Sequence, residues 1–314
     1  MIEKCDISVV VPVYGCSTSI RELYLRLIST LSGIVNEFEI IFVNDSSPDD
    51  AWVVITDICN RDARVVGIDL SRNFGQHNAI MAGLGYVRGE WVVVMDCDLQ
   101  DKPEEIKKLY NESLKGYDVV YGKRFHRKDT FVKRMNSKLF YKVFSYLTDT
   151  KQDYTIANFG IYNSKVISAV LSMGDVFCFF PVLVNWVGFK KTAIDIEHLA
   201  RANDKSSYTF GKLFNLALDV IISFSEKPIK VGLKIGIFMA IISFLVGFVY
   251  FVLYVFQVVT VPGFTSLIIA ISFSTGMILT FLGLLGLYIG KISTQVKLRP
   301  KFIVNHVIMG NAHE

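Results

Sequence analysis

Charged residues are absent from one long part of this 314-residue chain. Residues 235–290 contain no Asp, Glu, Lys, Arg or His. The stretch is too long for one membrane-spanning helix and fits two helices of about 20–25 residues each. We predict spans at residues 232–256 and 264–290, joined by the uncharged loop 257–263. A pair of helices buried in a soluble core is the alternative, which the length of both uncharged stretches disfavours.

Positive charge flanks the predicted spans on both sides. Three lysines precede the first span and four basic residues follow the second: Lys227, Lys230, Lys234, Lys291, Lys297, Arg299 and Lys301. Since basic flanks stay on the cytoplasmic side, both ends of the chain are expected in the cytoplasm. The N-terminus also lacks the basic and then apolar layout of a cleaved signal peptide. Residues 1–225 are therefore expected to be cytoplasmic, with residues 293–314 as a cytoplasmic tail. Within this tail we predict an extra strand at residues 301–308, which would mediate contacts between copies of the chain.

Cysteine is sparse, and its spacing fits no metal site. The five cysteines, at positions 5, 16, 59, 97 and 178, form neither a Cys-x-x-Cys pair nor a Cys/His zinc pattern. Because disulfides are rare in the cytoplasm, we predict that all five are free thiols.

Glycine motifs for binding nucleotides are absent as well. The sequence Gly83-Leu-Gly85-Tyr-Val-Arg-Gly89 has the wrong spacing for a dinucleotide fingerprint and falls late in a predicted helix. No Walker-type lysine loop is present either. A Rossmann dehydrogenase and a P-loop enzyme are excluded.

Apolar runs and helical segments alternate through the first 125 residues. Strands are predicted at residues 7–13, 39–43, 65–70, 91–95 and 118–121. Helices are predicted at 19–31, 48–61, 78–87 and 103–114, the first with a capping box formed by Ser19 and Glu22. This alternation predicts an α/β fold with a doubly wound, mostly parallel sheet. Such sheets bind ligands at the carboxyl ends of their strands.

After residue 125 the chain changes character. Residues 131–147 and 209–224 are predicted to be amphipathic helices that lie in the lipid headgroup layer, with ordinary core packing as the alternative. Basic residues are concentrated between positions 123 and 134. They fit either a solvated basic face or contact with phosphates and anionic lipids.

Two carboxylates, Asp96 and Asp98, follow the predicted strand 91–95. Mg²⁺ or Mn²⁺ is typically held by one or two carboxylates and completes its shell with substrate phosphates and water. An ion held in this way stabilises a diphosphate leaving group as a Lewis acid. The pattern predicts an enzyme that acts on a phosphorylated substrate at a membrane surface.

Four segments carry a resemblance to a known family: Val9-Val-Val-Pro-Val-Tyr14, Ile41-Phe-Val-Asn-Asp45-Ser-Ser-Pro-Asp49, Leu70-Ser-Arg-Asn-Phe-Gly75 and Val94-Met-Asp-Cys-Asp-Leu-Gln-Asp101. The chain resembles the family-2 glycosyltransferases with a GT-A fold. More narrowly, it is similar to the polyprenyl-phosphate glycosyltransferases, which include bactoprenol glucosyltransferases and dolichol-phosphate mannose synthases. The similarity extends over nearly the whole chain, including residues 185–189, 205–208 and 218–225.

The resemblance implies roles for the matching residues. Asp96 and Asp98 would be catalytic, with Asp98 as the metal ligand. The nucleotide and donor sugar would be bound by Pro12, Tyr14, Asp45, Arg72, Asp96, Gln100, Asp101 and Asn158. Phosphates and the acceptor would be bound by Lys123, Arg124, Lys133, Arg134, Ser137, Arg201, Lys205, Ser206 and Tyr208.

Asn158 is a departure from the family pattern, because relatives often carry an acidic residue in the matching segment. An Asn cannot act as a general base, and a sugar hydroxyl acceptor would need one. A lipid phosphate, with a second pKa of about 6, is already mostly dianionic at neutral pH and needs no base. The residue therefore favours a phosphate acceptor and leaves the donor sugar open, with an N-acetylated or otherwise modified hexose among the possibilities.

The sequence thus predicts an inverting, metal-dependent hexosyltransferase on the bacterial inner membrane. It would transfer a sugar from a nucleotide diphosphate to undecaprenyl phosphate, with UDP favoured over GDP as the nucleotide. The product would serve a surface polysaccharide such as the O-antigen of lipopolysaccharide. The expected partners are these two substrates, the membrane and further copies of the chain in a tetramer, with no nucleic acid. Two alternatives are a processive polysaccharide synthase and a catalytically silent membrane scaffold.

Overall fold

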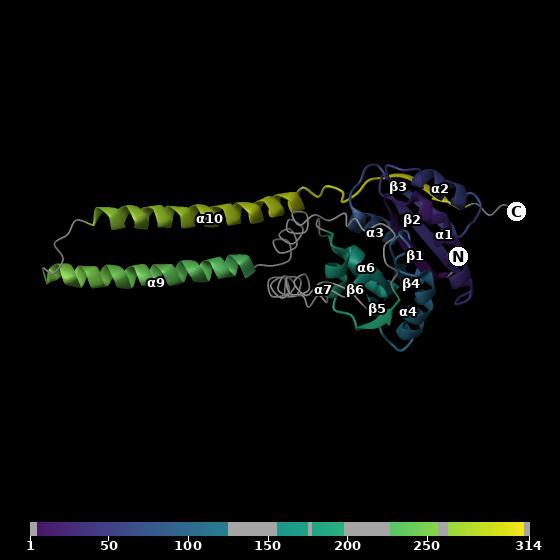
Figure 1. The fold of residues 1–314 in the computed structure, drawn as a ribbon, viewed down its shortest axis with the longest axis horizontal. Coiled ribbons are helices and arrows are strands. Elements are labelled where there is room, and N and C mark those ends of the chain that lie inside the picture. The colour runs from purple at the N-terminus through teal and green to yellow at the C-terminus, as the bar shows by residue number, and fades with distance from the viewer. Residues whose placement is uncertain (1–4, 125–155, 175–177, 198–226, 257–262, 311–314) are drawn as a thin grey trace. The chain divides into compact units, whose positions relative to one another are not determined.

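A computed structural model of the chain describes residues 5–124, 156–174, 178–197, 227–256 and 263–310 (Figure 1). These residues belong to two compact units. The first contains a β-sheet with its covering helices, and the second contains the two long helices α9 (Lys227–Val255) and α10 (Phe264–Val296). The predicted helices at 131–147 and 209–224 lie outside the described residues, and the predicted domain limits remain a prediction.

Within the described residues, the first unit is built on an eight-stranded sheet with the order β7-β5-β6-β4-β1-β2-β3-β8. Its strands are β1 (Cys5–Val13), β2 (Phe38–Asn44), β3 (Val65–Leu70), β4 (Gly89–Val94), β5 (Val119–Arg124), β6 (Ile156–Asn163), β7 (Lys191–Ile196) and β8 (Val304–Met309). The first five match the predicted strands to within a few residues.

Strands β4, β1, β2 and β3 run parallel and form the centre of the sheet. Val10 of β1 pairs with Ile41 of β2 on one side and with Val94 of β4 on the other. Continuous apolar runs suit these positions because a central parallel strand is covered on both faces. The predicted α/β fold class with a mostly parallel sheet is confirmed.

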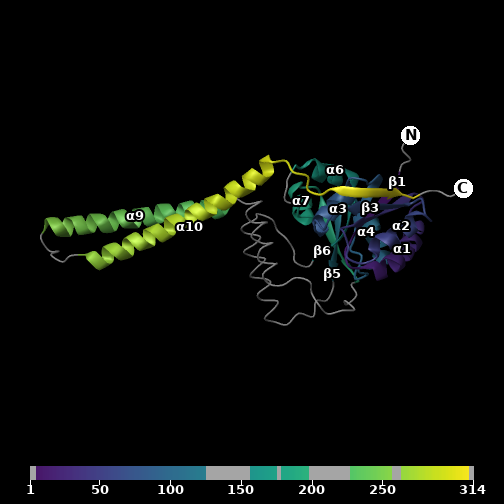
Figure 2. The same cartoon turned by 90° about the horizontal axis from the view of Figure 1, so that it is seen from above.

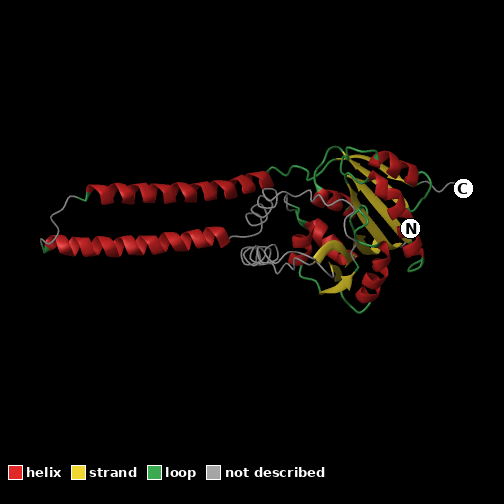
Figure 3. Cartoon of the chain, in the orientation of Figure 1, coloured by secondary structure: helices red, strands yellow, loops and turns green. Residues whose placement is uncertain are grey.

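Helices follow the parallel strands in alternation and cover the sheet (Figure 3). They are α1 (Ser17–Ser32), α2 (Ala51–Cys59), α3 (Gln76–Leu84), the short 3₁₀ helix η1 (Pro103–Glu105), α4 (Ile106–Ser113), α6 (Ser164–Ser172) and α7 (Phe180–Trp186). In α1 the buried side chains recur at the helical spacing, at Ile20, Leu23, Leu27 and Leu31.

The predicted capping box at the start of α1 is wrong. The helix begins at Ser17, and its N-cap residue is Cys16, which makes no side-chain capping bond. The carboxylate of Asp49 accepts a 2.9 Å hydrogen bond from the Ser17 backbone N–H, so a residue distant in sequence satisfies a donor of the first turn. The Ser19 hydroxyl is committed elsewhere, since it donates to the backbone carbonyls of Cys16 and Cys97.

The antiparallel strand β6 determines which ends of the outer strands lie at the ligand edge. It pairs antiparallel with both β4 and β5, so β5 runs in the same direction as β4. The end of β5 and the beginning of β6 therefore lie at the same edge of the sheet as the carboxyl ends of β1 to β4. Lys123 of β5 pairs with Ile156 of β6 at this edge.

The C-terminal segment returns from α10 to the sheet as strand β8, which pairs antiparallel with β3 (Figures 1 and 2). Its register places Val307 opposite Ile68, and the side chain of Asn305 donates a 3.0 Å hydrogen bond to Asp69. The expectation of an extra strand in the tail is confirmed. Its use in contacts between copies of the chain remains a prediction.

The helices α9 and α10 contain two segments long and apolar enough to cross a membrane, Ile229–Val249 and Phe273–Val296. Large apolar side chains, including Phe244 and Leu279, are exposed along both helices. Almost none of the residues in these segments is buried. A helix pair buried in a soluble core, the alternative considered for this stretch, does not fit such exposed apolar surfaces.

Candidate active site

Loops after the four central strands meet at the carboxyl edge of the sheet. They comprise residues 14–16 after β1, 45–50 after β2, 71–75 after β3 and 95–102 after β4. Because these strands are parallel, their carboxyl ends lie at one edge, and hydrogen bonds connect the loops there. The four strand-end segments singled out in the sequence are thus brought together.

Asp45 connects the loop after β2 with the loop after β3. The residue is 2% exposed, and its two carboxylate oxygens accept hydrogen bonds from the backbone N–H groups of Phe74 (2.7 Å) and Gly75 (2.9 Å). Burial raises the pKa of Asp45, and these two bonds act in the opposite direction. Gly75 adopts a φ of +92°, which favours glycine. Asp45 therefore shapes the site through the backbone of a neighbouring loop.

Asp49 connects the loops after β1 and β2. It accepts hydrogen bonds from the Ser17 backbone and from the Ser47 hydroxyl, while Ser47 in turn accepts one from the backbone of Gly15. Burial opposes ionisation of Asp49, but the bonds from Ser47 and Ser17 outweigh it and lower its pKa. Ser47 and Asp49 belong to the second segment that carries the family resemblance, but no role was predicted for either residue. Their place in a Ser-Ser-Pro-Asp turn was the available signal.

Asp96 and Asp98 are half-buried at the end of β4. Asp96 Oδ1 accepts a 2.6 Å hydrogen bond from the side-chain amide of Gln76, the first residue of α3. Asp98 Oδ1 accepts a 3.2 Å bond from the backbone N–H of Gln100, and Leu99 between them has a φ of +60°. Each carboxylate is thus held by a hydrogen bond from a different neighbour. Gln76 was missed in the sequence, where no spacing links it to Asp96.

Cys16 and Cys97 form a disulfide, so the prediction of five free thiols is wrong for this pair. Their Cα atoms are 6.5 Å apart, although 81 positions separate them in sequence. Cys97 lies between the two carboxylates of the Asp-Cys-Asp motif, and Cys16 occupies the N-cap position of α1. Folding brings the two thiols together because β1 and β4 are neighbours in the sheet. The prediction holds for Cys5, Cys59 and Cys178, which are free and buried.

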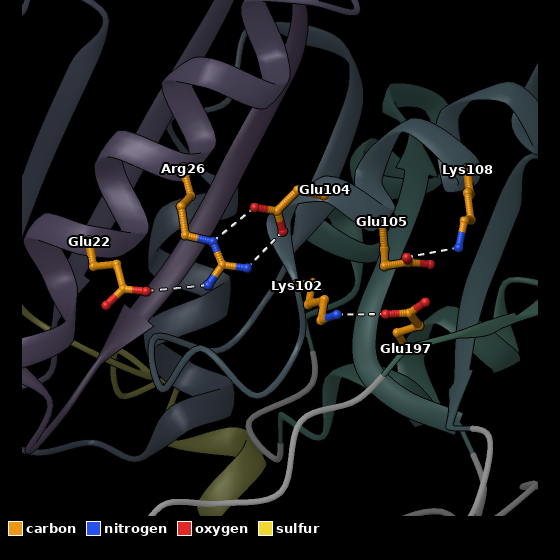
Figure 4. A network of polar contacts seen from close by, with 7 residues as sticks. All are labelled: Glu22, Arg26, Lys102, Glu104, Glu105, Lys108 and Glu197. Atoms are coloured by element: carbon orange, nitrogen blue, oxygen red, sulfur yellow. Dashed lines mark hydrogen bonds and ion pairs between the residues drawn. The ribbon is translucent and has the colours of Figure 1, made fainter.

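Ion pairs anchor the segment that follows the acidic motif (Figure 4). Glu104 accepts two hydrogen bonds from the guanidinium of Arg26 on α1, at 2.9 and 2.7 Å. Lys102 donates a 2.5 Å hydrogen bond to Glu197, which follows β7. Exposed pairs contribute little to stability individually, but here they position the backbone after Asp101 between two other elements.

The remaining residues that were predicted to bind the donor lie at the same edge of the sheet. Pro12 is buried in β1, Tyr14 is 54% exposed just beyond it, and Asp101 is 1% exposed. The guanidinium of Arg72 stacks over the ring of Phe74, 4.4 Å from its centroid. Gln100 is half-buried in the turn after Asp98.

The predicted phosphate-binding residues are described only in part. Lys123 and Arg124 end β5, and Asn158 lies near the beginning of β6, so their backbones lie at the carboxyl edge. The other predicted residues lie outside the described part of the chain: Lys133, Arg134, Ser137, Arg201, Lys205, Ser206 and Tyr208.

The oxygen ligands at the end of β4 suit a hard divalent cation. Asp96 and Asp98 provide carboxylate oxygens, which Mg²⁺ and Mn²⁺ prefer, and both side chains are half-buried. Among the described residues no group of three or more His, Cys, Asp or Glu side chains forms a closed cage. The arrangement therefore fits an ion that takes part of its shell from a phosphorylated ligand.

Comparison with known proteins identifies the family. The model of the family described as "Glycosyl transferase family 2" matches residues 8–170, which contain most of β1, all of β2, β3 and β4, and the acidic motif. The chain belongs to glycosyl transferase family 2. As a member of this family it is a glycosyltransferase, as the sequence predicted.

Curated relatives in this family cover nearly the whole chain. An uncharacterized glycosyltransferase, YkcC of Bacillus subtilis, is 37% identical over 97% of this chain and 94% of its own length. An undecaprenyl-phosphate 4-deoxy-4-formamido-L-arabinose transferase of Shewanella sediminis is 33% identical over 98% of this chain and 93% of its own length. The protein of the same name in Edwardsiella ictaluri is 32% identical over 97% and 95%. The similarity thus includes the segment with both apolar helices.

Proposed function

We propose that this glycosyltransferase moves a hexose-type sugar from a nucleotide diphosphate, most simply UDP, to undecaprenyl phosphate. One observation carries the proposal: a single chain joins a carboxylate-bearing edge of a family-2 sheet to two exposed apolar helices. Relatives named for transfer to undecaprenyl phosphate align with both parts.

The donor would bind at the carboxyl edge of the parallel strands. Tyr14 and Arg72 are placed to contact the base or ribose, on loops held by Asp45 and Asp49. The carboxylate of Asp96, oriented by Gln76, is placed for a sugar or ribose hydroxyl. These loops are fixed before the donor arrives, which lowers the entropic cost of binding it.

The acceptor would be a lipid phosphate, and the proposed reaction is an inverting displacement. An oxygen of the phosphate attacks the anomeric carbon, the bond from that carbon to the diphosphate breaks, and nucleoside diphosphate leaves. A phosphate dianion needs no base, consistent with an Asn at position 158. Lys123 and Arg124 end β5 at this edge and would offset the charge of two anions brought close together.

Asp98, with Asp96 beside it, would hold a divalent cation. When bound, the ion would supply Lewis-acid stabilisation of the diphosphate leaving group. The choice between Mg²⁺ and Mn²⁺ is open, because carboxylate ligands accept both.

The two apolar helices would anchor the enzyme as a multi-pass protein of the bacterial inner membrane. Lysines at 227, 230 and 234 and basic residues after 290 favour a cytoplasmic position for the sheet-containing unit. The product would then serve a surface polysaccharide, and a homo-oligomer such as a tetramer completes the proposal.

A donor panel tests this function. Purified protein is incubated with undecaprenyl phosphate, Mg²⁺ or Mn²⁺, and radiolabelled UDP-glucose, UDP-N-acetylglucosamine, UDP-galactose, UDP-N-acetylgalactosamine or GDP-mannose. We expect one donor to pass label into the organic phase. Asp98→Asn should reduce this transfer by a factor of about 100 or more, because charge stabilisation in the transition state is lost.

Glu112→Gln serves as the matched control, since it removes one carboxylate charge at the end of α4, where Glu112 pairs only locally with Lys115. Its activity should equal that of the unmodified enzyme. Label that enters a polymer instead would support a processive synthase. Absence of transfer from every donor, with the protein folded and UDP bound, would contradict the proposed reaction and favour a silent scaffold.

A further inference from the structure

The Cys16–Cys97 disulfide lies at the border between the hydrophobic core and the loops of the candidate donor site, because Cys97 belongs to the core and the half-buried Cys16 packs against it. It joins the loop that carries Tyr14 to the residue between Asp96 and Asp98. No other covalent link connects these two loops. The Ser19 hydroxyl supports the same junction without a covalent bond, because it donates to the carbonyl of Cys16 at 2.9 Å and to that of Cys97 at 2.7 Å.

The three remaining cysteines have a different environment. Cys5, Cys59 and Cys178 are buried, and burial raises the pKa of both Cys5 and Cys59 to about 11. Thiols of this kind are poor nucleophiles at neutral pH and are inert in exchange. Cysteine chemistry in the described residues is therefore concentrated at one pair, which lies among the residues that would bind the donor.

The two sulfur-bearing residues of the pair differ in access. Cys97 is 8% exposed, whereas Cys16 is half-buried next to the exposed Tyr14 and Gly15. An incoming thiolate can therefore approach Cys16 more readily than Cys97. Access to one sulfur is what thiol–disulfide exchange requires.

We propose that Cys16 and Cys97 form a reversible redox pair that controls how tightly this enzyme binds its nucleotide donor. The proposal rests on the proposed function for the identity of the ligand. Disulfides that form in the cytoplasm are usually catalytic or redox-sensing rather than structural, which is the chemical class that this pair fits.

A protein that carries two thiols can reduce the Cys16–Cys97 disulfide. One thiolate of the reductant attacks Cys16 Sγ, the Cys16–Cys97 bond breaks, and the Cys97 sulfur leaves and takes up a proton. This step leaves Cys16 in a mixed disulfide with the reductant. The second thiolate of the reductant then attacks the reductant's sulfur in that mixed disulfide, and Cys16 leaves, takes up a proton and becomes a thiol. The reductant becomes a disulfide, and two electrons have passed to the pair. Glutathione disulfide reverses the change and is itself reduced to two glutathione molecules.

The oxidised state is the form with high donor affinity. In this form Asp96 and Asp98 remain half-buried rather than covered, and Tyr14 is exposed, so the cross-link does not close the site. It holds the Tyr14 loop against the acidic motif before the ligand binds. After reduction no covalent bond joins Cys16 to Cys97, although the Ser19 hydrogen bonds and the pairing of β1 with β4 remain, and ordering the Tyr14 loop then opposes binding.

Two measurements test the inference, and the first does not depend on enzymatic activity. The full-length protein in detergent is equilibrated in glutathione buffers of graded redox ratio and quenched with acid. It is then unfolded in denaturant and alkylated with N-ethylmaleimide at neutral pH, and its intact mass is recorded. We expect three alkylated cysteines in the oxidised protein and five after reduction, with the change confined to peptides containing Cys16 and Cys97. Five alkylated cysteines in every buffer would overturn the proposal.

The second measurement is calorimetric titration of UDP, and separately of GDP, with Mg²⁺ present, against oxidised and reduced protein. We expect reduction to weaken binding of the preferred nucleotide about three- to tenfold, the cost of ordering one loop. The double variant C16S/C97S should bind with the weaker affinity in both buffers. Equal affinity of the oxidised and reduced enzyme would overturn the control of binding.

Cys5→Ala is the matched control, because it removes a buried thiol at the opposite edge of the sheet. It should lower both thiol counts by one and retain the response to reduction. If neither nucleotide binds in either state, the proposed donor class fails, and with it the control of binding. The thiol count then still decides whether the pair is reversible.

Discussion

The side-chain amide of Gln76 donates a 2.6 Å hydrogen bond to Asp96 Oδ1, joining the first turn of α3 to the acidic motif after β4. This contact fixes the orientation of a carboxylate that would touch the donor. Neither residue is near the other in sequence. The contact exists because Asp45 holds the loop immediately before Gln76 through the backbone of Phe74 and Gly75.

Replacing Gln76 by Ala should reduce kcat/KM for the nucleotide sugar by about 10- to 100-fold, the usual effect of removing a partner that orients a site carboxylate. The melting temperature should stay the same, because the amide supports a polar site rather than the core. Steady-state kinetics with the donor that the radiolabelled panel selects checks this. Asn36→Ala, at an exposed amide before β2, should be without effect. Unchanged kcat/KM in the Gln76 variant would contradict the role.

Glu39 should matter for stability and not for turnover. It is 1% exposed near the beginning of β2 and accepts hydrogen bonds from the Ser8 hydroxyl (2.6 Å) and from Arg88 Nε (2.8 Å). Glu39→Gln should lower the free energy of unfolding by about 1–3 kcal/mol, because charge-assisted bonds are lost at a buried position. Urea unfolding followed by tryptophan fluorescence measures this.

Glu37→Gln provides the comparison, since Glu37 lies two residues earlier and is exposed. Its free energy of unfolding should change by less than about 0.5 kcal/mol. Equal effects of the two substitutions would show that the buried contacts of Glu39 contribute no more to the free energy of unfolding than an exposed carboxylate does.

Asp49 should make part of the stability dependent on pH. Its pKa is lowered in the folded protein from a reference value of 3.8, with burial opposing and the hydrogen bonds from Ser47 and Ser17 dominating. The stabilisation is therefore fully present above pH 3.8 and is lost as the pH falls through the lowered pKa. Asp49→Asn should destabilise the protein by about 1–2 kcal/mol at pH 7.

The difference between Asp49→Asn and the unmodified protein should shrink below pH 3.8, when the carboxylate of the unmodified protein becomes protonated. Urea unfolding at a series of pH values down to the lowest at which the fold persists tests the sign. Asp50→Asn is the control, because Asp50 is exposed and makes no capping hydrogen bond. A difference independent of pH would contradict this assignment.

Strand β8 should stabilise the sheet through one face. Ile308 is half-buried and packs against the hydrophobic core, whereas its neighbour Val307 points to the other face and is 36% exposed. Ile308→Ala should reduce the free energy of unfolding by about 2 kcal/mol or more through lost burial. Val307→Ala should have a much smaller effect. Equal losses measured by urea unfolding would mean that β8 is held by backbone pairing alone.

Local sequence patterns predicted most of the sheet. The runs around Val10, Ile41 and Val94 are buried on both faces, so their apolar character alone identified the central strands and their parallel arrangement. The two apolar helices followed in the same way from the absence of charge between residues 235 and 290. Tyr14, Asp45, Arg72 and Asp96 could be placed at one edge because parallel strands end together.

Apolar runs, helical spacing, the uncharged stretch and the carboxylates of the acidic motif are properties of neighbouring residues, so they could be predicted from the sequence. The partners of groups distant in sequence depend instead on the tertiary structure. Cys16 met Cys97 because β1 lies beside β4, and Asp49 replaced the expected cap of α1. Gln76 reached Asp96, and β8 joined β3. Such contacts depend on how strands are ordered and loops are held, and no local spacing encodes them.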